Sequence, residues 1–216
     1  MMFKAVCFDF DYTLGDSTDS IVAGFVHGLT SLGWPAPERT AVRATIGYML
    51  EDAYTMLTGD SDPARRARFR LLFSEVAVER QRKETTLFPG APELLRGLKE
   101  QGAKSAIVSS KRRDTIEIIM DRFGLGDTLE LVVGSGDVKR PKPDPEGLLF
   151  VLDKMGVWPG EALFCGDTVL DAGAAQNAGT HFAAVLNGTT PARDFDCFPC
   201  DHISPDLWDL AQWLEL

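Results

Sequence analysis

The spacing of hydrophobic residues changes along the chain between a short-run pattern and a helical pattern. Residues 3–10 form a brief apolar run that contains and ends next to acidic side chains, which predicts a buried strand. Four later runs predict further strands, at residues 106–108, 131–133, 162–165 and 182–186. Segments with helical spacing lie between or beside them, at residues 92–101, 113–123, 145–155 and 170–178. Strands that alternate with helices predict a parallel sheet joined by crossover connections.

Residues 16–85 differ from the rest, because every apolar pattern within them is helical. Ile21, Phe25 and Leu29 recur at every fourth position. A later helix is expected after Asp62, since a capping residue is followed there by proline at the first helical position. We therefore predict an α/β fold with two parts: a Rossmann-like parallel-sheet core of residues 1–15 and 86–216, and an inserted all-helical cap domain of residues 16–85.

Composition and charge exclude several classes of protein. The 216 residues carry 32 acidic and 22 basic side chains, a formal net charge of −10, whereas nucleic-acid binders need a basic surface. No run of 18 apolar residues is available to span a membrane, and the N-terminal segment lacks the pattern of a signal peptide. We expect a soluble cytoplasmic protein, a monomer or weak homodimer, without nucleic-acid or membrane partners.

The four cysteines do not form a convincing metal or redox site. Cys7 and Cys165 lie within apolar runs, which is typical of buried thiols. Cys197 and Cys200 form a CxxC pair near His202, but a zinc site needs four ligands and no second cysteine pair follows. The pair lies in loop-like sequence between two prolines at 191 and 205, so we assign it no role.

Polar side chains follow several of the predicted strands. They are Asp9, Asp11 and Thr13 after the first strand, Ser109 after the second, Lys142 before helix 145–155, and Asp167 and Asp171 after a later strand. Ligands of open parallel sheets bind at the carboxyl ends of the strands, so these groups are expected to meet. Several carboxylates held together require a cation, and hard oxygen ligands suit Mg2+. Lysine and serine side chains are then available to hold phosphate oxygens.

Such a group of residues can transfer a phosphoryl group. One carboxylate can attack phosphorus to form an aspartyl phosphate, while a metal ion and a lysine reduce the repulsion between anions. A second carboxylate two residues away can protonate the leaving oxygen and later deprotonate water. Asp9 and Asp11 have this spacing, which places both side chains on one side of an extended segment.

Four motifs, in order, resemble those of the haloacid dehalogenase-like superfamily. FDFDYTLGDS at 8–17 resembles its DxDxT signature, and Ser109 in IVSSK its second motif. Lys142 in KPDP resembles the third motif, and GDTVLD at 166–171 the fourth. Residues 87–102 are typical of the phosphoglycolate-phosphatase-like branch, whose small helical cap is inserted where residues 16–85 lie. The resemblance covers nearly the whole chain, although Tyr12 stands where glycine is common in this branch.

The resemblance implies a role for each motif residue. Asp9 would be the nucleophile and Asp11 the general acid/base, a pair that favours phosphoryl transfer over dehalogenation. Mg2+ would be bound by Asp9, the backbone carbonyl of Asp11 and Asp167, with Asp171 as a ligand or in the surrounding shell. The phosphate-binding set would be Ser109, Ser110 and Lys142, with Thr13 either on the phosphate or stabilising its loop. Asp171 has a second interpretation as an acid in the first turn of a helix, where the dipole favours it.

The resemblance leaves the substrate and part of the chemistry open. We expect Mg2+-dependent hydrolysis of a small phosphorylated metabolite, such as a phosphoglycolate-like compound or a sugar phosphate. A phosphomutase of the β-phosphoglucomutase type and a non-catalytic phosphometabolite-binding module remain alternatives. Arg43 and Tyr48 are candidate substrate contacts from the cap, because residues 45–48 resemble the family's substrate-facing loop. Lys111 and Arg112 are expected to be surface charges at the start of a helix.

Overall fold

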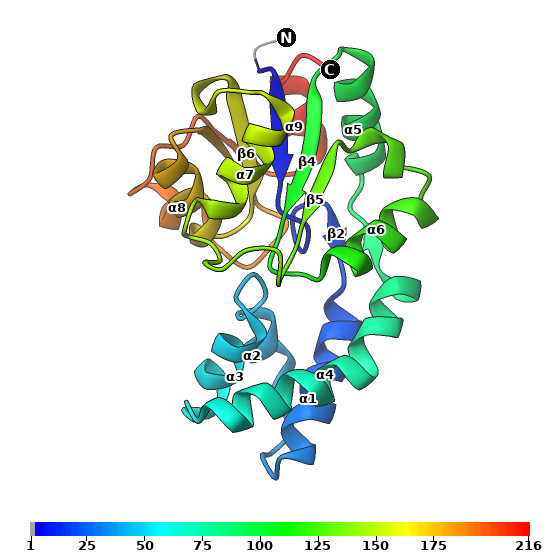
Figure 1. Ribbon diagram of the computed structural model, residues 1–216, viewed down its shortest axis with the longest axis vertical. Coiled ribbons are helices and arrows are strands. Elements are labelled where there is room, and N and C mark those ends of the chain that lie inside the picture. Colours follow the sequence, from blue (N-terminus) through cyan, green and yellow to red (C-terminus); the bar gives the residue numbers. More distant parts are fainter. Residues whose placement is uncertain (1–2) are drawn as a thin grey trace. The chain divides into compact units, whose positions relative to one another are not determined.

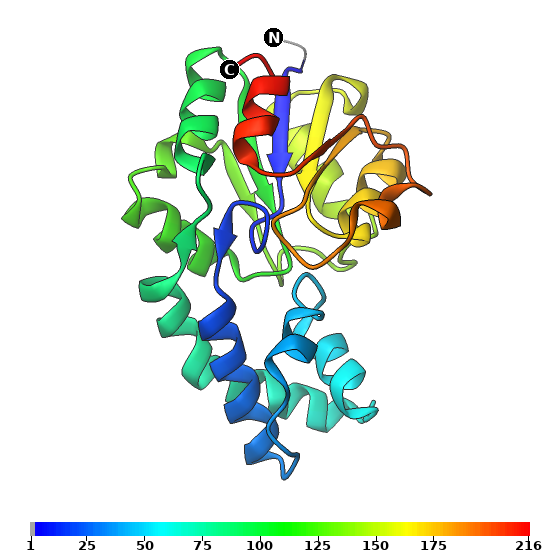
Figure 2. The same ribbon diagram turned by 180° about the vertical axis from the view of Figure 1, so that it is seen from behind.

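The computed structural model describes residues 3–216, which divide into two compact units (Figures 1 and 2). Unit 1 contains the residues through Asp16 together with Leu87–Leu216, and unit 2 is Ser17–Thr86. Strands β2 (Gly15–Asp16) and β3 (Thr86–Leu87) pair as a separate two-stranded sheet where the chain leaves and re-enters unit 1. Within residues 3–216, no helix is both long and apolar enough to cross a membrane.

Unit 1 is built on a sheet of six parallel strands in the order β5-β4-β1-β6-β7-β8. The strands are β1 (Ala5–Phe8), β4 (Lys104–Val108), β5 (Leu131–Val133), β6 (Ala162–Gly166), β7 (His181–Val185) and β8 (His202–Ser204). The helices are α5 (Ala91–Glu100), α6 (Arg113–Arg122), α7 (Glu146–Met155), α8 (Val169–Ala178) and α9 (Leu207–Trp213), with short 3-10 turns at Gly126–Thr128, Pro159–Glu161 and Ala192–Phe195. The predicted α/β class and parallel sheet are confirmed.

Each face of this sheet is covered by its own hydrophobic cluster. Val6 and Phe8 of β1 pack with residues of α5, α6 and α9, whereas Ala5 and Cys7 pack with residues of α7 and α8. Successive strand residues point to opposite faces, so a strand that is buried on both sides must be apolar throughout. This explains why β1 is a continuous apolar run instead of an alternating one. Helices α7 and α8 are visible in Figure 1, and α9 lies in front in Figure 2.

Strands β2, β3 and β8 were not predicted, and Asp16 of β2 lies in the stretch 16–85 that was expected to be entirely helical. The spacing of residues indicates a loop between Pro191 and Pro205, and that prediction is wrong for the three residues of β8. They pair in parallel with β7, with Val185 opposite Ser204. A three-residue edge strand has too short an apolar pattern to be recognised by itself, because its partner strand supplies most of the hydrogen bonds that define it.

Unit 2 contains four helices: α1 (Thr18–Ser31), α2 (Arg39–Arg43), α3 (Leu50–Thr58) and α4 (Pro63–Glu84). The carboxylate of Asp62 accepts a hydrogen bond from the backbone N–H of Arg65 at 2.8 Å, so α4 begins with the predicted cap. Helices α1 and α4 approach closely because Gly24 and Gly28 have no side chain. A β-carbon at Gly24 would lie 2.7 Å from Cβ of Ala77, which leaves no room for any other residue there.

Candidate active site

Strand β1 lies in the centre of the sheet, at the point where the strand order changes direction. Strands β4 and β5 lie on one side of it and β6 and β7 on the other. Phe8, the last residue of β1, pairs with Ile107 of β4 and Cys165 of β6, so these three strands end at nearly the same level. Such a switch point forms the ligand-binding crevice of open α/β sheets. The residues that follow the three strands therefore meet there.

Three carboxylates form a buried cluster at this edge of the sheet. Asp9, Asp167 and Asp171 are at most 2% exposed, and each offers an oxygen within 4.8 Å of the others. Burial, together with the charges of Asp171 and Asp9, raises the pKa of Asp167 well above its usual value. Burial also raises the pKa of Asp171, although Lys142 opposes this effect. Their proximity is unfavourable without a cation.

Lys142 supplies part of the required positive charge. Its ammonium lies 3.0 Å from Oδ1 of Asp9 and 2.5 Å from Oδ1 of Asp171. Burial by itself lowers the pKa of Lys142, but the charges of these two carboxylates outweigh burial, so its pKa lies above the ordinary value. One lysine against three ionised carboxylates leaves a charge of −2, which a divalent cation would balance.

An unsatisfied oxygen indicates where a cation fits. Among the described residues, Oδ1 of Asp9 accepts no hydrogen bond of good geometry, although the Lys142 ammonium is close. Buried polar atoms nearly always have partners, and a carboxylate oxygen without one is a suitable ligand for a hard cation. The three carboxylates therefore fit a divalent metal ion. The side chain of Asp11 lies outside this cluster, and its backbone carbonyl remains a predicted ligand.

Asp171 is both an acid in the first turn of a helix and a member of the carboxylate cluster. Its Oδ2 accepts hydrogen bonds from the backbone N–H and the hydroxyl of Thr168, at 3.0 and 2.6 Å, and forms a capping box at the start of α8. Its Oδ1 faces Lys142. The helix start thus orients a carboxylate that also belongs to the acidic cluster.

The hydroxyl candidates lie in the loops that surround the cluster. Thr13 is fully buried and donates a hydrogen bond to Oδ1 of Asp167 at 3.3 Å, so it orients that carboxylate. Ser109 is buried directly after β4, and its Oγ accepts a hydrogen bond from the backbone N–H of Lys111 at 3.3 Å. Ser110 is half-buried beside it. Their roles toward a phosphate remain predictions.

Lys111 is not the surface charge that was expected, and that prediction is wrong. Its side chain is 4% exposed, and its ammonium donates to both carboxylate oxygens of Asp11, at 3.0 and 2.8 Å. The neighbouring Arg112 is exposed and pairs with Asp114, as expected of a surface residue. A signal was present in the sequence: Lys111 follows Ser109 by two positions, the same spacing that relates Asp11 to Asp9.

The loop after β7 also reaches the site, and its residues were not among the candidates. The side-chain amide of Asn187 donates a hydrogen bond to the carbonyl of Thr13 at 3.2 Å. The backbone of Gly188 packs against the carboxylate of Asp167. The strand-end rule that selected Asp9 applies to this loop as well, since it directly follows the predicted strand 182–186.

The remaining candidates lie elsewhere in the chain. Arg43 ends α2, Tyr48 follows the turn after it, and both are half-buried residues of unit 2 whose role toward a substrate remains a prediction. Tyr12 is 3% exposed and has a φ of 61°, in the left-handed region.

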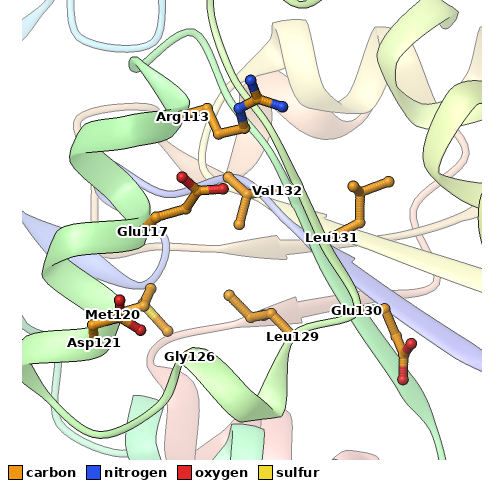
Figure 3. Close-up of a pocket in the computed structure, with 9 residues that line it drawn as sticks. All are labelled: Arg113, Glu117, Met120, Asp121, Gly126, Leu129, Glu130, Leu131 and Val132. Atoms are coloured by element: carbon orange, nitrogen blue, oxygen red, sulfur yellow. The ribbon is translucent and has the colours of Figure 1, made fainter.

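A cavity of about 330 Å³ lies between α6 and β5, and Figure 3 shows its lining residues. None of these lining residues is a predicted site residue.

Comparisons with known proteins point to one family. Residues 6–185 match the profile of the haloacid dehalogenase-like hydrolases. The chain is 31% identical over 210 residues to a phosphoglycolate phosphatase from Pseudomonas putida, covering 94% of this chain and 75% of that protein. It is also 31% identical over 206 residues to the pyrophosphatase PpaX from Bacillus velezensis, covering 95% and 94% of the two chains.

A solved structure shows the same arrangement of elements. The crystal structure of a haloacid dehalogenase-like hydrolase from Bacteroides fragilis superposes with a TM-score of 0.93 at 36% identity, over 96% of this chain and 99% of that one. The match to the profile covers most of the sequence. One curated relative is named a phosphoglycolate phosphatase and the other a pyrophosphatase. The chain therefore belongs to the haloacid dehalogenase-like hydrolases, in their phosphoglycolate-phosphatase-like branch, and is a phosphatase.

Proposed function

We propose that the protein hydrolyses a small organic phosphate monoester, with Mg2+ as its cofactor and Asp9 as the nucleophile. The observation that carries this proposal is the state of Asp9. Its carboxylate is 1% exposed at the end of the central strand, one of its oxygens lacks a well-formed hydrogen bond, and Lys142 lies 3.0 Å away. A buried carboxylate held beside a cation is suited to attack an anionic phosphorus centre.

The proposed reaction has two half-reactions. An oxygen of Asp9 forms a bond to phosphorus as the bond from phosphorus to the leaving oxygen breaks. At the same time Asp11 gives its proton to the leaving oxygen. Asp11 then takes a proton from a water molecule, whose oxygen attacks phosphorus and displaces Asp9. Inorganic phosphate leaves, and Asp9 is regenerated. Mg2+ bound by Asp9, the Asp11 carbonyl and Asp167, with Asp171 beside them, would offset the negative charge of the phosphoryl group.

The other site residues would orient the phosphoryl group. Lys142 already lies beside Asp9, so its ammonium is positioned to contact phosphoryl oxygens next to the nucleophile. Ser109 and Ser110, from the loop after β4, would donate hydrogen bonds to the same group. Thr13 would act mainly through Asp167, to which it donates.

The proposed substrate class is supported by the relatives, which are named for phosphoglycolate and pyrophosphate. The substrate would be a small phosphorylated metabolite. The protein itself would act in the cytoplasm as a monomer or weak homodimer. Residues 16–85 would serve as the cap, with Arg43 and Tyr48 as its substrate contacts. A closing cap would exclude bulk water and leave one water molecule for the second half-reaction.

A phosphate-release screen over several dozen phosphorylated metabolites with Mg2+ tests the proposal. The wild-type protein should release phosphate from at least one compound, and Asp9→Asn should reduce turnover by at least about a thousandfold while the protein stays folded. Asp153→Asn, an exposed aspartate on α7, serves as the matched control and should keep full activity. Substantial turnover by Asp9→Asn would contradict the mechanism. Isomerised sugar phosphate without free phosphate would indicate a phosphomutase. If no compound reacts, the result would indicate a non-catalytic binding module.

A further inference from the structure

The ion pair between Lys111 and Asp11 is buried, although its two residues come from different loops. Both carboxylate oxygens of Asp11 accept hydrogen bonds from the Lys111 ammonium, and the two side chains are 4% and 12% exposed. The same ammonium lies 5.7 Å from the ring centroid of Phe10, between Asp9 and Asp11 in sequence. Lys111 thus contacts the segment that carries the proposed nucleophile and the proposed acid/base.

The backbone of Lys111 is held from several directions. Its N–H donates to Oγ of Ser109, and its carbonyl oxygen accepts a hydrogen bond from the N–H of Ser135 at 2.8 Å. Gly134 lies so close that a β-carbon there would be 2.6 Å from that carbonyl oxygen. The lysine therefore extends from a constrained loop and not from a mobile surface segment. Such support is what a functional side chain needs for a defined position.

The distribution of charge explains why Asp11 is paired with Lys111 and not with Lys142. Asp9, Asp167 and Asp171 form one cluster with Lys142, and a fourth carboxylate there would be repelled by the others. Lys111 instead holds the carboxylate of Asp11 apart from that cluster, on the side of the loop after β4. Each lysine thus determines the position of a different carboxylate.

We propose that Lys111 is a positioning residue for Asp11: it holds this carboxylate where it meets the leaving oxygen of the substrate. The inference rests on the proposed function, in which Asp11 passes its proton to that oxygen as the bond to phosphorus breaks. In this step one oxygen of Asp11 carries the proton and the other keeps the hydrogen bond from Lys111. Without the Lys111 contact, Asp11 loses its orientation while Asp9 and Lys142 keep theirs. Chemistry that depends on Asp11 should therefore suffer more than chemistry that depends on Asp9 alone.

Leaving groups of different acidity separate this role from a purely structural one. An alkyl phosphate has a poor leaving group that needs the proton from Asp11, whereas 4-nitrophenyl phosphate has an acidic leaving group that needs it little. Lys111→Met keeps the length of the side chain and removes its charge. It should lower kcat/KM by about a hundredfold for the best alkyl phosphate of the screen, and by less than about tenfold for 4-nitrophenyl phosphate. Lys111→Arg should recover part of the loss.

A double-mutant cycle with Asp11 provides the second measurement. If Lys111 acts through Asp11, adding Lys111→Met to Asp11→Asn should change kcat/KM by less than about threefold. Arg112→Met, at the adjacent exposed position, is the control and should match the wild type. Thermal unfolding reports whether each variant folds. If Lys111→Met alone unfolds, the double variant with Asp11→Asn can still be measured, because neither residue of the pair then carries a buried charge without a partner.

The outcomes separate this inference from the proposed function. An equal loss on both substrates, or additive effects in the cycle, would overturn the role of Lys111 while phosphatase activity stands. If the wild-type protein releases phosphate from neither substrate, the proposed function fails and this inference fails with it.

Discussion

Gly188 and Asp167 are in such close contact that a β-carbon on residue 188 would lie 2.0 Å from Oδ2 of the aspartate. The two residues follow different strands, β7 and β6, which are neighbours in the sheet. Asp167 is 2% exposed and its other oxygen accepts a hydrogen bond from Thr13, so its carboxylate has little freedom to move aside. The missing side chain at residue 188 is therefore a condition for the position of this carboxylate.

Gly188→Ala should displace the Asp167 carboxylate and weaken divalent metal binding by at least about tenfold, or about 1.4 kcal/mol. Titration calorimetry with Mg2+ on the purified protein measures this directly. Gly160→Ala is the matched control, because a β-carbon at Gly160 would meet nothing within 4 Å. Equal Mg2+ affinity in both variants would show that Asp167 tolerates the new methyl group.

Tyr12 combines a buried ring with a left-handed backbone, and two substitutions separate these effects. Tyr12→Ala and Tyr12→Gly both remove the ring and should lower the free energy of unfolding by about 3–5 kcal/mol. Because the φ of 61° is unfavourable for residues with a β-carbon, the glycine variant should be more stable than the alanine variant by about 1 kcal/mol. Urea unfolding measures both differences.

Phe10 gives the control for this comparison. It is fully buried and does not have a positive φ. Phe10→Gly should therefore be less stable than Phe10→Ala, by about 0.5–1 kcal/mol. The same order of glycine and alanine at both positions would contradict the explanation from backbone conformation.

Mg2+ should stabilise the protein, because its charge would balance the carboxylates of Asp9, Asp167 and Asp171. At a concentration about 100 times its Kd, the gain is about 2.7 kcal/mol, which corresponds to a rise in Tm of roughly 5–10 °C. Removal of the metal with a chelator should reverse the rise. Asp167→Asn should largely abolish it, and Asp153→Asn should not; an undiminished rise in Asp167→Asn would place the binding elsewhere.

Asp60 in unit 2 should contribute to the pH dependence of stability. Hydrogen bonds from the backbone N–H of Asp62 and from the hydroxyl of Tyr54, followed by Arg65, hold the pKa of Asp60 below its usual value. A lowered folded-state pKa stabilises the fold above the unfolded-state pKa, about 4, and this contribution is lost as pH falls through the folded-state value. Asp60→Asn should therefore be less stable than the wild type at neutral pH.

Urea unfolding between neutral and acidic pH checks this expectation. The difference between the wild type and Asp60→Asn should shrink as the pH falls, because the wild-type carboxylate becomes protonated and loses its advantage. Asp153→Asn, at an exposed position, should show a small difference that does not depend on pH. A constant gap for Asp60→Asn would mean that the contacts of Asp60 act without regard to its charge.

Local patterns were sufficient for most of the elements and for most of the polar residues of the site. The apolar run of β1 and the Asp62 cap of α4 depend on residues that are near one another in sequence, so spacing alone predicts them. The rule that polar residues after parallel strands share one edge then led to Asp9, Ser109 and Asp167. Strand β8 was missed because it exists only through its pairing with β7.

The order of the longer strands and helices, and the positions of carboxylates after strands, could be predicted from the sequence because hydrophobic periodicity is a local property. The folded chain was needed to show that Lys142 pairs with Asp9 and Asp171 while Lys111 pairs with Asp11. It was also needed to show that Gly188 must leave room for Asp167. These relationships join residues far apart in the chain. Their energies depend on burial and on the distances between charges, which exist only after the strands have been brought into one sheet.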